Sequence, residues 1–206
     1  MKREDWMASV RNALAGLSRT LRGISDTSSS AAKPKLGVEE GNKLAERSSR
    51  NLQHALGFLW ENRSYKFGTA TTVRSFIDSL ARIVSDGLLP PGQSLYRTWV
   101  TEFDQALPEN IEQEYNNFCE WFFDNVDGDD PVTVAAMTEK RLDGKIHPFA
   151  DGCGRTAKLL AAFALLRSEF LPVSHRSREE YYQRINESDE EWIRYYTALD
   201  AEGREP

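Results

Sequence analysis

The sequence predicts a mainly α-helical, compact domain with one short β element. Most of the chain from residue 38 to residue 200 carries apolar residues at the three- and four-residue spacing of a helix. Several of these segments have recognisable helix ends, and only residues 92 to 103 combine alternation with β-branched and aromatic side chains. We therefore expect a helical domain with a short β-hairpin or extended flap.

The first predicted helix spans residues 5 to 23, where five apolar residues share one face: Trp6, Val10, Leu14, Leu17 and Leu21. The serine-rich residues 25 to 30 and the following Pro34 predict a flexible linker, because small polar side chains offer little apolar surface against the entropy of ordering. We assign residues 1–35 to this helix and linker and residues 36–206 to the main domain.

The main domain is predicted to contain helices at roughly 38 to 61, 70 to 86, 109 to 125, 131 to 144, 155 to 169, 177 to 185 and 188 to 200. Asp130 before a proline is an N-cap signal, and Ser188 with Glu191 is a capping box. Gly87 and Gly144 predict helix ends, since glycine tolerates the left-handed conformation that follows a helix.

Composition limits the classes of partner. A formal net charge of -6 argues against nucleic acid, and no apolar run is long enough to cross a membrane. No secretory signal is visible, so we expect a cytoplasmic protein; a secreted effector and a homodimer remain open. The two cysteines are too few for a disulfide framework and lack the paired spacing of a zinc site. Cys119 is expected to be a buried thiol.

Residues 147 to 155 read His-Pro-Phe-Ala-Asp-Gly-Cys-Gly-Arg and lead directly into a predicted helix. A glycine-rich turn before a helix N-terminus favours anions, because backbone N–H groups converge there and the helix dipole is positive. Arg155 adds a guanidinium suited to phosphate, and the carboxylate of Asp151 suits the Mg²⁺ that accompanies phosphates. With His147 as a proton acceptor, these residues predict phosphoryl or nucleotidyl transfer.

This stretch resembles the signature of the Fic family, usually written His-Pro-Phe-x-Asp/Glu-Gly-Asn-Gly-Arg-x-x-Arg, and the resemblance extends over roughly residues 70 to 200. The resemblance implies the Fic fold and transfer of AMP from ATP to a Ser, Thr or Tyr hydroxyl of a protein; relatives transfer other phosphate-containing groups. It implies that His147 is the general base, that Asp151 binds Mg²⁺ and that Phe149 anchors the loop. The residues implied to hold the donor phosphates are Gly152, Gly154 and Arg155.

The resemblance also suggests two binding surfaces. Residues 92 to 100 look like the flap on which relatives dock an extended target, so Tyr96, Arg97 and Trp99 are candidate docking residues, although they equally suit a covered edge strand. Tyr182 lies where relatives place contacts to the nucleotide base. His54 and His175 are outside the motif and are expected to be structural.

Two positions depart from the signature. The resemblance implies that both positions, like Phe149 in the loop, contribute to binding of the donor. Cys153 replaces an asparagine whose amide donates a hydrogen bond to the donor phosphate, and a thiol is a weaker donor; Lys158 keeps the charge of the final arginine without its bidentate geometry. Three readings follow: a changed donor or acceptor, slow AMP transfer, or phosphate binding without chemistry. A further reading makes Cys153 a nucleophile or redox switch, because it lies before a helix N-terminus and next to Arg155.

Overall fold

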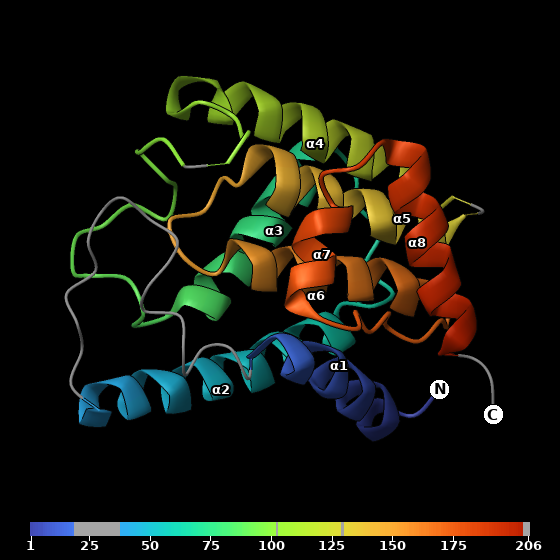
Figure 1. Cartoon of the computed structure of the whole chain (residues 1–206), viewed down its shortest axis with the longest axis horizontal. Helices are drawn as coiled ribbons and strands as arrows, with labels where there is room; N and C mark the ends of the chain where they lie inside the picture. Colours follow the sequence, from blue (N-terminus) through green and yellow to red (C-terminus); the bar gives the residue numbers. More distant parts are fainter. Residues whose placement is uncertain (19–37, 102, 129, 204–206) are drawn as a thin grey trace.

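The computed structural model describes residues 1–18, 38–101, 103–128 and 130–203, which form a helical domain (Figure 1). The prediction of a mainly α fold is confirmed. The helices are α1 (Arg3–Ser18), α2 (Val38–Glu61), α3 (Ala70–Ser85), the 3₁₀ turn η2 (Pro108–Asn110), α4 (Ile111–Asn125), α5 (Pro131–Glu139), the π-helix η3 (Lys140–Ile146), α6 (Cys153–Arg167), α7 (Arg178–Arg184) and α8 (Asp189–Glu202).

Helix α6 lies at the centre of the domain. Every residue from 159 to 166 is buried, so this part of α6 is apolar on all sides and has to be enclosed by other helices. The helices α1, α2, α3 and α5 supply that enclosure, and Figure 1 shows α6 in the middle of the bundle. The N-terminal turn of α6 is thereby held firmly at the point where residues 147 to 152 end.

Helix α1 is part of this core. Trp6 and Val10 are fully buried, and the ring of Trp6 packs against Trp60 of α2 at a centroid distance of 5.9 Å. The helix begins at Arg3 and the described part ends at Ser18. The predicted continuation to residue 23, the serine-rich linker and the boundary near Leu36 lie outside the described residues.

Most predicted helix ends are found. The side chain of Asp130 accepts a hydrogen bond from the backbone of Thr133, and Ser188 forms the predicted capping box with Glu191. Gly87 follows α3 with a φ of 60°. These capping side chains satisfy N–H groups that have no partner within their own helix.

The predicted end at Gly144 is wrong, because the helix continues as η3 to Ile146. The glycine serves close packing: a Cβ atom there would lie 3.1 Å from the Cγ1 atom of Ile185. π-Helical turns within an α-helix often occur at functional sites. This one brings the chain to His147.

The predicted β-hairpin of residues 92 to 103 is not confirmed, and the described residues of this segment form no strand of their own. In the described part of this segment the only β pairing is an isolated antiparallel bridge between Tyr96 and Phe149. The backbone N–H of Arg97 donates to Pro148, and that of Ala150 donates to Leu95, both at 2.8 Å. The β-forming residues pair with residues 147 to 150, whose backbone supplies the hydrogen bonds a second strand would have supplied.

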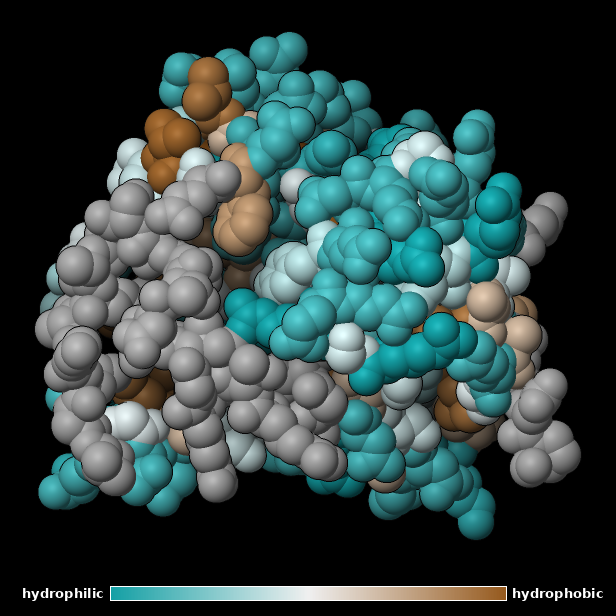
Figure 2. Space-filling model, viewed as in Figure 1, coloured by the Kyte–Doolittle hydropathy of each residue, from teal (hydrophilic) through white to brown (hydrophobic). Residues whose placement is uncertain are grey.

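Among the coloured residues in Figure 2, polar side chains predominate over α7 and α8, while apolar residues gather where the segment before α4 runs. The exposed apolar residues of that segment are Val100, Phe103 and Leu107. Within the described ranges no helix is both long and apolar enough to cross a bilayer.

Candidate active site

Residues 147 to 155, here called the motif loop, follow η3 and include the first turn of α6; the chain passes through two left-handed backbone positions between the two helices. His147 has φ 47° and ψ 59°, and Gly152 has φ 71° and ψ 13°. A side chain at Gly152 would be strained, and its Cβ would also lie 2.7 Å from the Cγ1 atom of Val84. Glycine at 152 therefore lets the loop lie against α3 while turning into the first residue of α6.

Phe149 fixes the middle of the loop. Its side chain is 1% exposed, it stacks on Tyr96 at 6.1 Å, and it meets the edge of Tyr115 at 5.7 Å. Tyr96 in turn donates a hydrogen bond to Asp78 at 2.6 Å. The expected anchor role of Phe149 agrees with this packing, and the ring of Tyr96 is committed to the same cluster.

Arg97 is placed differently from the docking role expected for it. The residue is 3% exposed, and its guanidinium donates to the backbone carbonyls of His147, Ile146, Ala106 and Trp99. Four of the five guanidinium N–H groups thereby bond to backbone carbonyls, which holds the loop to the segment beside it and leaves the side chain buried rather than presented to a target. Of the three predicted docking residues, Trp99 is partly exposed and Tyr96 half-buried.

Asp151, just before the N-cap of α6, lies beside Arg155 on the first turn of that helix. Their side chains form an ion pair at 3.0 Å, and Arg155 also donates to the hydroxyl of Ser48 on α2 at 2.6 Å. Both side chains are about a quarter exposed, at 25% and 26%. The predicted metal carboxylate and phosphate guanidinium are thus brought together at the helix N-terminus, where the first N–H groups lack helical partners.

His147 faces a carboxylate that the sequence did not single out as functional. Its Nδ1 lies 3.3 Å from Oδ1 of Asp143 and 3.2 Å from the backbone oxygen of the same residue. Asp143 is 2% exposed and also accepts a hydrogen bond from Tyr181 at 2.9 Å. The spacing of four residues was the only signal for this contact, and the predicted helix end at 144 hid it.

The two partners shift each other's pKa. Burial lowers the pKa of His147, but the neighbouring Cys153 and Asp143 side chains outweigh burial and raise it well above its usual value. Burial raises the pKa of Asp143, yet the hydrogen bond from His147 and the charge of Lys158 lower it to about 2. Asp143 is therefore a carboxylate at every physiological pH, and it favours the protonated imidazole.

Lys158 lies in a buried charge cluster, which we define as Glu139, Lys158, His175 and Tyr196. Its ammonium is 3.7 Å from Glu139, 3.8 Å from Asp143 and 3.4 Å above the centre of the Tyr181 ring. Glu139 also pairs with His175 at 3.0 Å and accepts a hydrogen bond from Tyr196 at 3.0 Å. Lys158 was predicted to hold donor phosphate, but its charge is already matched by two buried carboxylates.

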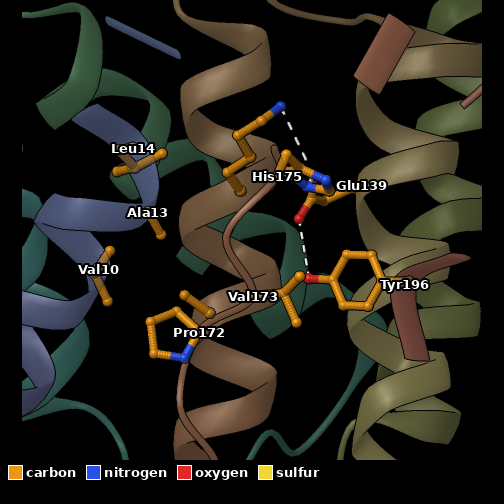
Figure 3. A pocket seen from close by; sticks show the side chains of 10 residues that line it. Val10, Ala13, Leu14, Glu139, Pro172, Val173, His175 and Tyr196 are labelled. Atoms are coloured by element: carbon orange, nitrogen blue, oxygen red, sulfur yellow. Dashed lines mark hydrogen bonds and ion pairs between the residues drawn. The ribbon is translucent and has the colours of Figure 1, made fainter. Parts of the chain in front are cut away.

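Figure 3 shows this cluster at a small cavity of about 10 Å³, which α1 closes with Val10, Ala13 and Leu14. His175 points into the cluster, as expected for a structural histidine, although its Nδ1 has no hydrogen-bond partner among the described residues. A cavity of this volume holds at most about one water molecule, so it admits no nucleotide.

Cys153 and Gly154 begin α6 next to Asp143. The thiol of Cys153 is 2% exposed and donates to the carbonyl of Leu142 at 3.4 Å. A Cβ atom at Gly154 would lie 3.1 Å from Oδ2 of Asp143, so the missing side chain lets that carboxylate approach the helix. Both residues had been expected to contact phosphate, and the structure gives each a contact within the protein.

Tyr182 is 39% exposed, and its ring is nearly parallel to that of Phe103, with 6.5 Å between ring centres and 7° between planes. Arg178 lies over the same tyrosine at 5.2 Å. The sequence analysis identified Tyr182 alone. Phe103 was missed, because its contact joins segments about eighty residues apart and leaves no local pattern.

Comparisons with known proteins support the motif. Residues 71–165 match the model of the Fic/DOC family. The chain is 35% identical over 102 residues to protein adenylyltransferase Fic of Nematostella vectensis, and 33% identical over 93 residues to protein adenylyltransferase fic-1 of Caenorhabditis elegans. These matches cover 48% and 44% of the chain but only 23% and 18% of the two relatives, so the chain spans about a fifth of their length.

Solved structures show the same fold. IbpAFic2 in complex with adenylylated Cdc42 superposes with a TM-score of 0.69 at 18% identity, covering 98% of this chain and 64% of that one. Fic-1 from C. elegans gives a TM-score of 0.64 at 24% identity and covers 98% and 62%. At these identities the likeness concerns the arrangement of the helices, including that of α1 to α8 around the loop.

Proposed function

We propose that this chain, whose residues 71–165 match the model of the Fic/DOC family, transfers a nucleotidyl group, in the first instance AMP from ATP, to a hydroxyl of a protein. The observation that carries the proposal is the pairing of His147 with the buried carboxylate of Asp143, one loop away from the Asp151–Arg155 pair. A proton acceptor and a phosphate-binding turn then lie on one short stretch of chain. The relative IbpAFic2 is recorded with an adenylylated protein, Cdc42, which supports a protein acceptor here.

His147 is the proposed general base. With Asp143 as the acceptor at Nδ1, the imidazole carries its hydrogen there and keeps the lone pair of Nε2 for the acceptor hydroxyl. The raised pKa of His147 means that the neutral, active form grows as the pH rises above the usual histidine range. Asp143 is the proposed positioning residue, since it fixes the orientation of the ring.

The proposed donor site lies at the first turn of α6. Arg155 and the N–H groups after Gly152 are suited to the donor phosphates. Asp151 offers a quarter-exposed carboxylate, a hard oxygen ligand of the kind that Mg²⁺ takes together with substrate phosphates, so the residues present fit that ion. When bound, the ion neutralises phosphate charge. When the donor binds, the ion pair between Asp151 and Arg155 would be replaced by contacts of Arg155 with the phosphates and of Asp151 with the ion.

The nucleotide base is proposed to lie against Tyr182 and Phe103. The ring of Tyr182 on α7 and the parallel ring of Phe103 form an exposed aromatic surface. Stacking on aromatic side chains tolerates every base, so this surface sets no preference for ATP over GTP, CTP or UTP. Trp99 is the remaining predicted docking residue with an exposed side, and the cytoplasmic location and homodimer stay predictions from the sequence.

A second candidate function is phosphate binding with weakened transfer or with a different donor. It is favoured by the contacts of the two departures from the family motif: the Cys153 thiol donates to Leu142, and Lys158 pairs with Glu139 and Asp143. Removing one preorganised donor from a developing oxyanion typically costs about a hundred- to a thousandfold in rate. The same loop would then still bind a nucleotide.

Intact-mass spectrometry of the chain and of candidate acceptors, after incubation with Mg²⁺ and each of the four nucleotides, tests the proposal. An adduct with the mass of a nucleotidyl group is expected, and His147→Ala should reduce its rate by about 100- to 10,000-fold, the usual share of a general base. His54→Ala, at an exposed histidine on α2, is the matched control and should leave the rate unchanged.

An adduct that survives His147→Ala would remove the proposed base. Nucleotide binding without any adduct, measured by calorimetry, would instead support the second candidate.

A further inference from the structure

Three side chains with different ligand atoms meet where η3, the motif loop and α6 join: Asp143, His147 and Cys153. Each offers one ligand atom, and these atoms all lie within 4.8 Å of one another. We propose that this trio binds a thiophilic divalent ion of the Zn²⁺ type, at a place distinct from the carboxylate of Asp151. The spacing of the two cysteines in the sequence gave no sign of such a site, because only one of them takes part.

The trio is held in place by the surrounding fold. The thiol of Cys153 and the backbone N–H of His147 both donate to the carbonyl of Leu142, at 3.4 and 2.9 Å. Asp143 is fixed by the hydroxyl of Tyr181 at 2.9 Å and reaches α6 because Gly154 has no side chain. The three side chains are therefore already gathered and held by the protein before an ion binds, which lowers the entropic cost of forming the site.

The chemistry of the ligands favours Zn²⁺ over Mg²⁺. Sulfur, imidazole nitrogen and carboxylate oxygen are the three ligand types of protein zinc sites, at about 2.3, 2.0 and 2.0 Å from the ion. A tetrahedral ion with those bond lengths separates its ligands by about 3.3 to 3.6 Å, so the trio needs to contract by roughly 1 Å. Mg²⁺ takes oxygen ligands and does not favour a thiol.

Exposure and charge are also compatible with an ion. Asp143 and Cys153 are each 2% exposed, whereas the imidazole of His147 is 30% exposed and leaves one side open for a water as fourth ligand. Three protein ligands with an open fourth position differ from structural zinc sites, in which four protein ligands close the coordination sphere. Binding releases the thiol proton and the second proton of any protonated His147 imidazole, so that thiolate and carboxylate together balance the two charges of the ion.

The consequence for activity rests on the proposed function. An imidazole bound to a metal ion is no longer free to accept a proton from a hydroxyl, so the bound ion would stop transfer. The thiol that replaces the usual asparagine of the motif would thus make the same histidine responsive to zinc. Binding itself is independent of that consequence and is measured first.

The test uses the full chain, freed of metal, and Co²⁺ as a spectroscopic probe for Zn²⁺. We expect one equivalent to bind, with a thiolate-to-cobalt charge-transfer band that Zn²⁺ abolishes by displacement. Cys153→Asn, which restores the usual residue of the family motif, should remove the band and weaken Zn²⁺ binding by at least about tenfold. Cys119→Ala is the matched control at the other buried cysteine and should keep both the charge-transfer band and the Zn²⁺ affinity.

Circular dichroism checks that each variant is folded, and His147→Ala replaces Cys153→Asn in the same titration if that variant does not fold. A Co²⁺ complex without a thiolate band, or Zn²⁺ affinity unchanged in the variant, would overturn the proposal. Cys153-dependent binding without any nucleotidyl adduct would refute the proposed function alone. Transfer that Zn²⁺ inhibits equally in wild type and Cys153→Asn would refute only the metal site.

Discussion

The motif places two cations on the first turns of α6, and the structure gives them opposite environments. Arg155 is a quarter exposed and pairs with Asp151 at the helix N-terminus, where a ligand can replace that partner. Lys158, three residues later, is 10% exposed and belongs to the buried charge cluster with Glu139. The signature gives both positions the same role, yet only Arg155 keeps a side open to an anion.

The difference teaches that charge at a motif position does not by itself make a ligand site. A buried charge requires partners inside the protein, because desolvation is costly, and those partners then occupy it. Glu139 and Asp143 satisfy Lys158 in this way, while Asp143 also faces His147. In the proposed mechanism, Asp143, which is paired with Lys158 of the buried charge cluster, orients the base, and the Asp151–Arg155 pair lies at the donor site.

The largest effect is expected when the charge of Glu139, the buried partner of Lys158, is removed. Glu139→Gln leaves Lys158 and His175 with an incomplete set of partners in the interior, so we expect a loss of about 3–5 kcal/mol in the free energy of unfolding. Urea denaturation followed by circular dichroism measures it. Asp151→Asn should change the same quantity by less than about 1 kcal/mol, because its ion pair is partly exposed.

Glu120→Gln, at an exposed position of α4, controls for the substitution itself. Equal losses in the Glu139 and Asp151 variants would show that the two regions do not differ in the way described.

A second variant tests whether Asp143 orients the proposed base, His147. Asp143→Asn keeps the shape of the side chain but loses the charge that orients the imidazole of His147, so transfer should fall by roughly 10- to 100-fold. The fall is expected in kcat, with the KM for the donor nearly constant, because Asp151 and Arg155 are untouched. Steady-state kinetics at several nucleotide concentrations would separate the two, and a rise in KM alone would contradict the positioning role.

Much of the fold, and part of the contrast between Arg155 and Lys158, could be predicted from the sequence. Helix periodicity and caps are local, and they predicted the helices and the signals at Asp130 and Ser188. The motif loop was also recognisable, because a glycine-rich turn before a helix has a local cause. Asp143 was assigned to a helix end because Asp-Gly is a stop signal, whereas the structure continues the helix through it.

What the sequence could not predict depends on contacts between distant segments. Arg97 has the charge of a docking residue, but its burial arises from four carbonyls on separate parts of the chain. The predicted hairpin is not confirmed for a similar reason, since the backbone near Tyr96 pairs with Phe149. The partners of Lys158 come from α5 and η3, and only folding brings them within 4 Å.

A third variant distinguishes the two cations directly. Lys158→Arg introduces a larger side chain at a packed position, so we expect a loss of about 1–3 kcal/mol in unfolding free energy and no gain in nucleotide affinity. Arg155→Lys should weaken nucleotide binding by about 1.5–3 kcal/mol, the value of a hydrogen bond to a charged group, with little effect on folding. Calorimetry and denaturation on both variants measure this. Tighter nucleotide binding by Lys158→Arg would place the residue at the donor after all.

The smallest expected effect is a pH dependence that belongs to the buried charge cluster. Burial raises the pKa of Glu139, but His175 and Lys158 outweigh burial and leave the pKa below its usual value. A carboxyl whose pKa is lowered by folding contributes stability above its unfolded pKa of about 4.3, and that contribution is lost as the pH falls through the folded value. Each unit of lowering corresponds to about 1.4 kcal/mol.

The difference in unfolding free energy between wild type and Glu139→Gln should therefore shrink as the pH falls below about 5. Urea denaturation of both proteins at a series of pH values measures that difference. Both proteins contain the other buried carboxylate, Asp143, so its contribution to the pH dependence of the unfolding free energy cancels in the difference. A difference that stays constant down to pH 3 would mean that Glu139 gains no net stabilisation of its charged form from Lys158 and His175, and the two regions of α6 would then differ in exposure alone.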